Sequence, residues 1–256
     1  MTSLHYVREG SGPVVFLSHA LGSHLGMWDE VAANLKNRFT VIRYDHRGHG
    51  NSEKSHAAFS IDDMADDAAS LIRTLSPNEK VSFVGLSMGG MVAQSLAARH
   101  SQLLNSIVIA NSTEYYDDNA RKNWIARIES VNASGIKPIA EAIISRWFTS
   151  EFIHDQKNSA NDLVKKAQIV LEDSDSLSYT LSCKAVSDID FRTSNTLINI
   201  PTLLIAGAKD EATPLSLSQV IHQKIKGSKM VEMNTAHLSA VEAPKEFIST
   251  LYSFLI

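Results

Sequence analysis

The pentapeptide Gly85-Leu86-Ser87-Met88-Gly89 is the stretch of the sequence whose residue types and spacing point most directly to chemistry. It follows the apolar run 81–84 and precedes a helical pattern that starts near Gly90, which predicts a tight strand–turn–helix connection. Glycines are needed there because strand and helix approach each other closely around a strained serine. The turn would lift the Oγ atom of Ser87 out of the sheet edge as a nucleophile. The alternative is a glycine-rich loop with an incidental serine, and the flanking elements favour the nucleophile.

A serine at its ordinary pKa is a weak nucleophile, so a base and an orienting acid must also be present. Asp210 closely follows the apolar run 202–205, and His237 follows a run that ends near Met233. The chain order Ser, Asp, His and the position of each residue after a strand are typical of a catalytic triad in an α/β sheet. Taken singly, Asp210 could be a loop or capping acid, and His237 could be an N-cap or a partly buried histidine. Order and placement together favour Ser87, Asp210 and His237 as the triad.

An oxyanion hole is the remaining requirement of this chemistry. The backbone N–H of Met88, which follows the nucleophile, is one expected donor. The second donor should come from the loop after the strand 14–18, and we predict the N–H of Leu21 because the small Ala20 and Gly22 let that loop close over the site. Loss of one such donor typically lowers the rate by on the order of a hundredfold to a thousandfold.

Apolar runs and helical patterns alternate along most of the chain, which indicates a mostly parallel α/β sheet flanked by helices. The helix predicted over 61–75 has the clearest start, because Ser60 can cap it and two aspartates occupy its first turn. Strands are predicted at residues 4–8, 14–18, 40–44, 81–85, 106–110, 202–207 and 229–234, and helices at 27–35, 61–75 and 91–100.

The alternation stops between Thr113 and about Asn195, where only helical patterns occur, around 120–131, 138–147, 161–171 and 177–185. Connections in α/β folds are usually far shorter, so this segment is interpreted as a helical insertion. The predicted organisation is a first core part at 1–112, a helical cap at 113–195 and a second core part at 196–256.

Composition narrows the class of protein further. The chain of 256 residues has 24 Lys and Arg against 28 Asp and Glu, and mild acidity without a basic block argues against a nucleic-acid partner. No apolar run approaches the roughly 18 residues needed to span a bilayer, and the start does not resemble a signal peptide. The single Cys183 cannot form an internal disulfide, which favours a reducing, cytoplasmic location. With Ser87 as nucleophile, Cys183 needs no catalytic role.

Ten histidines raise the alternative of a metallohydrolase, because His46 and His49 are closely spaced and His19 and His24 lie nearby in the motif loops. The sequence has no acid-and-histidine arrangement like that of a metalloprotease helix, so no metal is expected. We expect His19 and His49 to belong to motifs that shape the rim of the site. The remaining histidines are expected at the surface: His5, His56, His100, His154 and His222.

Several motifs together make the chain resemble the α/β-hydrolase superfamily, and within it the 3-oxoadipate enol-lactonases. The segments that carry this resemblance are Ser18-His19-Ala20-Leu21-Gly22-Ser23, Met27-Trp28, Arg43-Tyr44-Asp45, Arg47-Gly48-His49-Gly50, the pentapeptide around Ser87 extended to Gly90, Arg146-Trp147-Phe148-Thr149 and Ala236-His237-Leu238-Ser239. His46 departs from the pattern, which has a smaller or less polar residue at that position. The resemblance implies a cytoplasmic serine hydrolase of aromatic-compound catabolism that opens an enol-lactone and needs neither a metal nor an organic cofactor.

The implied substrate is a small anionic lactone, and its carboxylate requires a cationic partner. Arg146 is the predicted partner because a guanidinium matches a carboxylate in a fork, and Trp147 would wall the pocket. The alternatives are a solvated surface arginine and a tryptophan in the core of the cap. A carboxylesterase, another lactonase, a C–C bond hydrolase or a perhydrolase could share the triad, and a ligand-binding receptor could share the fold.

Overall fold

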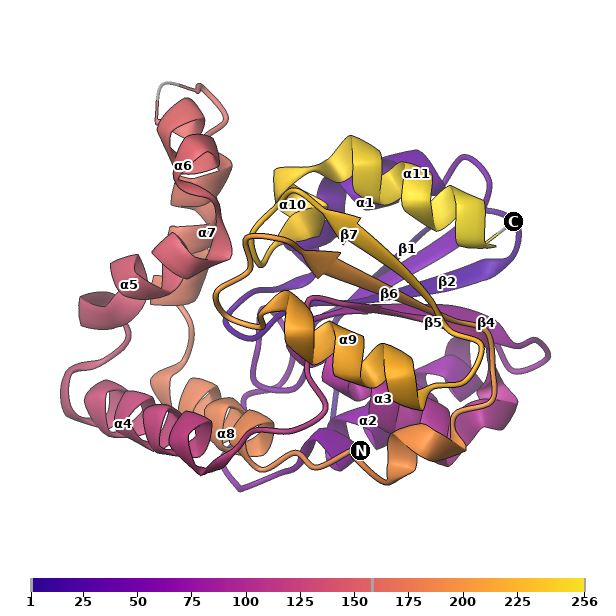
Figure 1. Cartoon of the computed structure of the whole chain (residues 1–256), viewed down its shortest axis with the longest axis horizontal. Coiled ribbons are helices and arrows are strands. Elements are labelled where there is room, and N and C mark those ends of the chain that lie inside the picture. The colour runs from indigo at the N-terminus through magenta and orange to yellow at the C-terminus, as the bar shows by residue number, and fades with distance from the viewer. Residues whose placement is uncertain (1, 158, 256) are drawn as a thin grey trace.

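The computed structural model of the chain describes residues 2–157 and 159–255, which form a seven-stranded sheet in the order β1-β3-β2-β4-β5-β6-β7 (Figure 1). Only β1 pairs antiparallel with its neighbour, and every other pair in the sheet is parallel. The strands are β1 (Tyr6–Gly10), β2 (Val14–Ser18), β3 (Thr40–Tyr44), β4 (Val81–Leu86), β5 (Leu104–Ala110), β6 (Thr202–Gly207) and β7 (Lys229–Met233). The predicted α/β-hydrolase fold, a mostly parallel sheet flanked by helices, is confirmed.

Helices cover both faces of this sheet, so its central strands are buried from both sides. Helices α1 and α11 lie on one face, and α2, α3 and α9 lie on the other (Figure 1). All five residues of β2 are buried, as expected for an apolar run inside a parallel sheet. The helices of this core are α1 (Asp29–Leu35), α2 (Ile61–Leu75), α3 (Met88–His100), α9 (Leu215–Lys224), α10 (Ser239–Glu242) and α11 (Pro244–Leu255), with the short 3₁₀ segment η1 (Leu25–Trp28) before α1.

The predicted start of α2 agrees with the structure. Ser60 accepts a hydrogen bond from the N–H of Asp63, and the carboxylate of Asp63 accepts one from the N–H of Ser60 at 2.7 Å. This reciprocal capping box satisfies two backbone donors at the helix end. Several other boundaries differ from the prediction, among them those of β1, α3 and β5, which starts at Leu104. β1 starts at Tyr6, because its pairing register aligns Tyr6 with Tyr44, and α3 starts at Met88, because the turn at Ser87 leads directly into the helix despite two early glycines.

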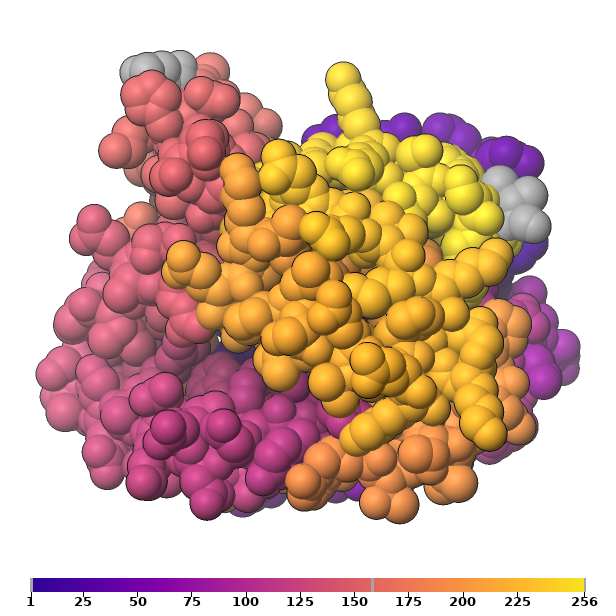
Figure 2. All heavy atoms as spheres, in the orientation of Figure 1, coloured from indigo at the N-terminus to yellow at the C-terminus, as the bar shows by residue number. Residues whose placement is uncertain are grey.

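Within the described residues, five α-helices and a short 3₁₀ segment at Ser194–Leu197 occupy the long connection between β5 and β6. In Figure 1 the five α-helices lie beside the carboxyl ends of β6 and β7, and Figure 2 shows them packed against the C-terminal part of the chain. One of the five, α6, was not predicted from the sequence pattern, because it is only seven residues long. The division into core parts at 1–112 and 196–256 with a helical cap at 113–195 stays a prediction. The helices are α4 (Asp118–Ser134), α5 (Lys137–Trp147), α6 (Ser150–Gln156), α7 (Leu163–Glu172) and α8 (Ser176–Ser187).

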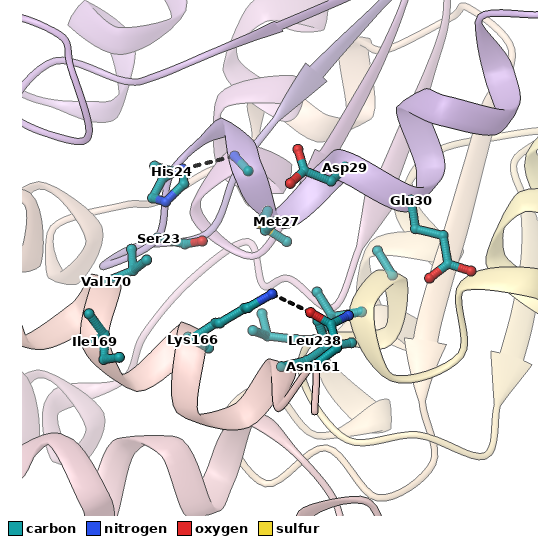
Figure 3. Close-up of a pocket in the computed structure, with 15 residues that line it drawn as sticks. Ser23, His24, Met27, Asp29, Glu30, Asn161, Lys166, Ile169, Val170 and Leu238 are labelled. Carbon is teal, nitrogen blue, oxygen red and sulfur yellow. Dashed lines mark hydrogen bonds between the residues drawn. The ribbon is translucent and has the colours of Figure 1, made fainter. Parts of the chain in front are cut away.

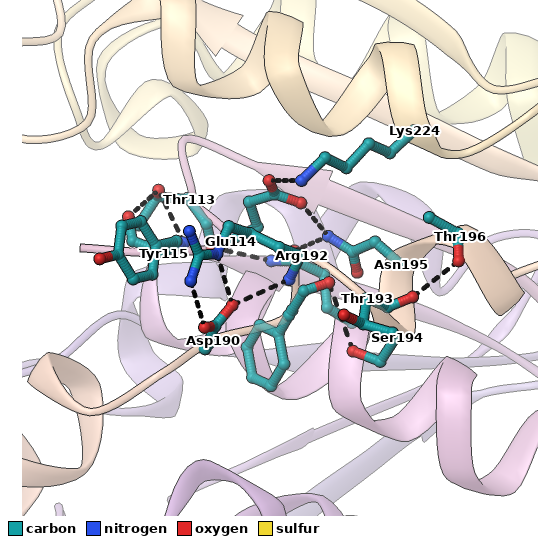
Figure 4. Close-up of polar contacts among 12 residues, drawn as sticks. Thr113, Glu114, Tyr115, Asp190, Arg192, Thr193, Ser194, Asn195, Thr196 and Lys224 are labelled. Carbon is teal, nitrogen blue, oxygen red and sulfur yellow. Dashed lines mark hydrogen bonds and ion pairs between the residues drawn. The ribbon is translucent and has the colours of Figure 1, made fainter. Parts of the chain in front are cut away.

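The two ends of this helical insertion are held side by side (Figure 4). The N–H of Phe191 donates to the carbonyl of Glu114 at 2.8 Å, next to an isolated β-bridge between Tyr115 and Asp190. The buried carboxylate of Glu114 accepts a hydrogen bond from the side chain of Asn195 at 2.9 Å and pairs with Lys224 of α9. The insertion therefore leaves and re-enters the core through one narrow neck that is attached to α9. No helix within residues 2–157 and 159–255 is long and apolar enough to cross a membrane.

Candidate active site

Ser87 lies in the turn between β4 and α3 with a backbone φ of 57°, a conformation that side chains other than glycine rarely adopt. Gly85 and Gly89, which lie on either side of the turn, must be glycines. A Cβ atom on Gly85 would lie 2.0 Å from the carbonyl oxygen of Gly89, and one on Gly89 would lie 2.2 Å from that of Ser18. The N–H of Ser87 donates to the carbonyl of Ala110 at 2.8 Å, which fixes the turn against β5. The structure therefore holds Ser87 in the strained turn that the spacing of the glycines predicts.

The structure brings Ser87, His237 and Asp210 into one hydrogen-bonded chain. Nε2 of His237 lies 2.8 Å from Oγ of Ser87, and Nδ1 of His237 lies 2.9 Å from a carboxylate oxygen of Asp210. The three side chains follow β4, β7 and β6 at the carboxyl edge of the sheet, and all three are buried. In this geometry Nδ1–H donates to the carboxylate, so Nε2 is free to accept the hydroxyl proton of Ser87.

Asp210 is surrounded by donors that keep it ionised. The N–H groups of Ala212 and Thr213 each donate to one carboxylate oxygen at 2.8 Å, and the side chains of Thr213 and Asn111 donate to the other at 2.8 and 3.0 Å. Burial alone would raise the pKa of Asp210, but His237 and these hydrogen bonds outweigh it and lower that pKa below its ordinary value. Asp210 is therefore a charged acceptor for His237 near neutral pH.

Asn111 is a part of the site that the sequence analysis missed. It follows β5 with a φ of 47°, and its amide donates both to Asp210 and to the carbonyl of Ala236, just before His237. Ser239 in turn donates to the Oδ1 atom of Asn111 at 2.6 Å. A strained non-glycine residue that links the acid and base loops is typical of a functional site. Its position directly after a predicted strand was the one signal available in the sequence.

The two residues predicted to supply the oxyanion donors are near Ser87, since Met88 follows it directly and Leu21 lines the same cavity. Met88 is the first residue of α3, so its N–H is among the donors that no helical carbonyl reaches. Leu21 lines the same cavity as Ser87, and no acceptor for its N–H occurs in the described part of the chain. Leu21 belongs to a turn in which the N–H of Ser23 donates to the carbonyl of Ala20 at 3.2 Å. The arrangement is suited to an oxyanion hole, whose role in catalysis stays a prediction.

Aromatic side chains and two arginines from the insertion cover Ser87. The cavity there has a volume of about 60 Å³, and Trp147 lies in its wall, where the sequence places it. Arg146 also lines the cavity, with its guanidinium donating to the carbonyl of Glu211 at 2.6 Å. The other aromatic residues of the wall are Tyr116, Trp124 and Tyr179.

Arg127, which the sequence analysis missed, is the second arginine of the cavity. Its guanidinium stacks 4.6 Å from the ring centre of Trp124, one helical turn earlier on α4. Both Arg127 and Arg146 also line an adjoining cavity of about 110 Å³. The i, i+3 spacing of Trp124 and Arg127 on a predicted helix was the available signal.

His19 and His49 belong to motifs that are expected to shape the rim of the site. Both are buried beneath the turn that carries Leu21, together with His46, and the ring centres of His19 lie 4.5 Å from His46 and 5.2 Å from His49. Apolar packing against that turn encloses them. Within the described ranges, no group of three or more His, Cys, Asp or Glu side chains is arranged to hold a metal ion.

Some of the histidines that are expected at the surface are partly buried. His5 and His100 are partly buried and contact Asp45 and Asp66 at 3.0 and 2.6 Å.

Cys183 is buried in α8, and its burial raises the pKa of the thiol to about 12, so the thiol stays protonated.

A larger cavity of about 530 Å³ lies between η1, α1, α7 and α10 (Figure 3). His24 on its wall accepts a hydrogen bond from the N–H of Gly26 at 2.9 Å, and Lys166 donates to the side chain of Asn161. The side chains that line it include no nucleophile paired with a base. The candidate active site is therefore the smaller cavity over Ser87.

Known proteins are similar to this chain in sequence and in fold. Residues 13–244 match the family described as alpha/beta hydrolase fold. The 3-oxoadipate enol-lactonase 2 of Acinetobacter baylyi is 32% identical over 247 residues, which cover 96% of this chain and 90% of the relative. A putative carbamate hydrolase of Serratia proteamaculans is 26% identical and covers 95% of this chain and 91% of its own length. The crystal structure of an enol-lactonase from Burkholderia xenovorans superposes with a TM-score of 0.94 at 31% identity, over 99% of this chain and 96% of that one. The chain is a hydrolase and belongs to the α/β-hydrolase fold family.

Proposed function

We propose that this hydrolase opens 3-oxoadipate enol-lactone to 3-oxoadipate through an acyl-enzyme on Ser87. The observation that carries the proposal is the Ser87–His237–Asp210 chain lying under two arginines of the insertion. The triad supplies ester chemistry, and the arginines supply recognition of an anionic substrate. Similarity to enol-lactonases along nearly the whole chain supports the same substrate class.

In the first half-reaction His237 takes the proton of Ser87 while Oγ attacks the lactone carbonyl carbon. The N–H groups of Leu21 and Met88 stabilise the oxyanion of the tetrahedral intermediate. The bond to the ring oxygen then breaks as the imidazolium of His237 gives its proton to that oxygen, which leaves as an enol that ketonises, and His237 is neutral again. Asp210 stabilises the imidazolium of His237 throughout, because its carboxylate is ionised and hydrogen-bonded to Nδ1.

In the second half-reaction a water molecule attacks the ester on Ser87 while His237 accepts its proton. Collapse of the second tetrahedral intermediate returns that proton to Oγ of Ser87 and releases the dicarboxylate product. The residues present complete both halves, so the proposed reaction needs neither a metal nor an organic cofactor.

Both arginines contribute to binding the free carboxylate of the substrate. Arg146 is held by the carbonyl of Glu211, which orients its guanidinium at the cavity. The guanidinium of Arg127 lies over the ring of Trp124, which holds it beside the cavity. The small cavity, with a volume of about 60 Å³, favours a short acyl group. The substrate partner is therefore a small anionic lactone, and a role in aromatic-compound catabolism in the cytoplasm belongs to the same proposal.

A spectrophotometric assay of ring opening tests the proposal. Purified enzyme should open the enol-lactone much faster than it hydrolyses p-nitrophenyl acetate, which is neutral and tests simple carboxylesterase activity. Ser87→Ala should lower the enol-lactone rate by on the order of a millionfold. Ring opening no faster than hydrolysis of the aryl ester would contradict the proposed substrate and favour a carboxylesterase. Full activity of Ser87→Ala would contradict the acyl-enzyme.

A further inference from the structure

Two buried histidines contact the backbone on either side of Leu21. Nδ1 of His19 lies 2.8 Å from the carbonyl oxygen of Ala20, and Nε2 of His49 accepts the N–H of Gly22 at 3.3 Å. The far nitrogen of each ring reaches the turn after β3. The N–H of His46 donates to Nε2 of His19 at 2.9 Å, and Nδ1 of His49 lies 3.1 Å from the carbonyl oxygen of Arg47. Each ring therefore bridges two backbone segments.

These backbone partners define the protonation state of both rings. A carbonyl oxygen can only accept a hydrogen bond and a backbone N–H can only donate one. His19 must therefore carry its proton on Nδ1, facing Ala20, and His49 must carry its proton on Nδ1, facing Arg47. Both Nε2 atoms act as acceptors, so both rings are neutral. A second proton on either ring would face a backbone N–H and break that bridge.

The bond from His19 has a specific effect on the predicted oxyanion donor. The carbonyl of Ala20 and the N–H of Leu21 belong to the same planar, trans peptide unit, so they point in opposite directions. Fixing the carbonyl of Ala20 therefore fixes the direction of the Leu21 N–H. His49 fixes the next peptide unit through Gly22, whose φ of 71° is the value that a type II turn needs at that position.

We propose that His19 and His49 are positioning residues that aim the N–H of Leu21 at the oxyanion formed on Ser87. The inference rests on the proposed acyl-enzyme chemistry and extends it to two side chains that do not touch the substrate. A donor held in advance needs no reorganisation as charge develops, and this is the largest single contribution in many hydrolases. His46 has a different role, because its ring contacts Oγ of Ser18 at 2.9 Å and not the turn of Leu21.

The surroundings of the two rings favour the neutral state. Burial lowers the pKa of His19 to about 3 and also lowers the pKa of His49. The carboxylate of Asp45 raises the pKa of both rings, and His24 lowers the pKa of His19 further. From the insertion, the turn is faced by apolar atoms, since the side chains of Leu171 and Tyr179 come within 2.6 and 3.1 Å of the place where a Cβ on Gly22 would lie.

Amide side chains allow a matched test at position 19. In asparagine, the same number of bonds separates the side-chain amide nitrogen from Cα as separates Nδ1 from Cα in histidine. In glutamine, the amide nitrogen is as far along the side chain as Nε2 of histidine. His19→Asn therefore keeps the donor to Ala20, and His19→Gln and His19→Leu remove it. For His49, whose Nε2 is the acceptor, His49→Gln keeps the contact with Gly22 and His49→Leu removes it. His46→Leu is the control, because it removes a buried histidine of the same cluster without touching this turn.

The measurements are kcat and KM for p-nitrophenyl acetate per active site titrated with a fluorophosphonate, and the Kd of n-butylboronic acid, which forms a tetrahedral adduct on Ser87. His19→Leu and His19→Gln should lower kcat by about ten- to a hundredfold and weaken the boronate by a similar factor, with little change in KM. His19→Asn and His49→Gln should keep most of the activity. His46→Leu should lower the melting temperature and leave kcat per titrated site unchanged.

Equal kcat in His19→Asn and His19→Gln would overturn the inference, even if His19→Leu did not fold. A loss in His46→Leu as large as that in His19→Leu would also overturn it, because the effect would then be one of general packing. The aryl ester separates this inference from the proposed substrate. If the wild-type enzyme hydrolysed the ester but not the enol-lactone, the substrate proposal would fail and the variants would still report on the positioning of Leu21.

Discussion

Mild acid should destabilise this fold through its buried histidines, well before its carboxylates titrate. Burial lowers the pKa of His19 from its ordinary value of 6.5 to about 3, and it lowers the pKa of His46 and of His49 as well. The unfolded chain therefore binds protons at a higher pH than the folded chain does. The stabilisation is fully present above pH 6.5 and is lost as the pH falls from there towards the folded value.

The size of this loss in the free energy of unfolding follows from the lowered pKa of His19. Each pH unit below the unfolded pKa lowers the free energy of unfolding by about 1.4 kcal/mol for one such group, so His19 alone accounts for about 1.4 kcal/mol between pH 7.5 and pH 5.5. His46 and His49 act in the same direction. Carboxyl groups contribute little in this interval, because their ordinary pKa values of about 4 lie below it.

Urea-induced unfolding at pH 7.5, 6.5 and 5.5, followed by tryptophan fluorescence, measures this loss. The free energy of unfolding should fall by at least about 1.4 kcal/mol over that range. His46→Leu should show a smaller pH dependence, whereas His56→Gln, which changes an exposed histidine, should keep that of the wild type. A wild-type stability that stayed constant or rose as the pH fell to 5.5 would refute the assignment of neutral, buried rings.

Three further predictions concern the site and its turn. Gly85→Ala should destabilise the fold by about 3 kcal/mol or more, seen as a lower melting temperature, because its Cβ would lie 2.0 Å from a backbone oxygen of Gly89. Asn111→Ala should lower kcat about tenfold, and Asn111→Gly, which relieves the positive φ, should recover the melting temperature but not kcat; recovery of kcat in the glycine variant would contradict the role given to the amide. Arg127→Leu and Arg146→Leu should each raise KM for the enol-lactone by about tenfold or more and leave hydrolysis of p-nitrophenyl acetate nearly unchanged, and equal losses on both substrates would contradict carboxylate recognition.

The sequence predicts those parts of the molecule that depend on local chemistry. The glycines around Ser87 are required by close backbone contacts, so their spacing between an apolar run and a helical pattern indicates the turn. Asp210 and His237 follow apolar runs that form β6 and β7, and parallel strands bring such positions to one edge. The continuous burial of β2 likewise follows from its apolar run.

The remaining features depend on packing between distant segments, which a periodic pattern does not encode. Arg127 reaches the cavity because α4 packs against α8 and is turned towards Ser87. His19 and His49 are polar residues in loop motifs, a pattern that suggests exposure, yet the turn of Leu21 and the helix α7 close over them. Asn111 gains its role from Asp210, 99 residues away in the chain.

The narrow neck of the insertion has a consequence for how such enzymes can diversify. Because Glu114 and Phe191 are joined by a backbone hydrogen bond, the core presents the same two anchor points whatever lies between them. The entropic cost of closing a loop between fixed ends rises only slowly with loop length, by about 0.6 kcal/mol for each doubling. The helices of the insertion can therefore be lengthened, shortened or exchanged as one unit, while the sheet and the triad keep their arrangement.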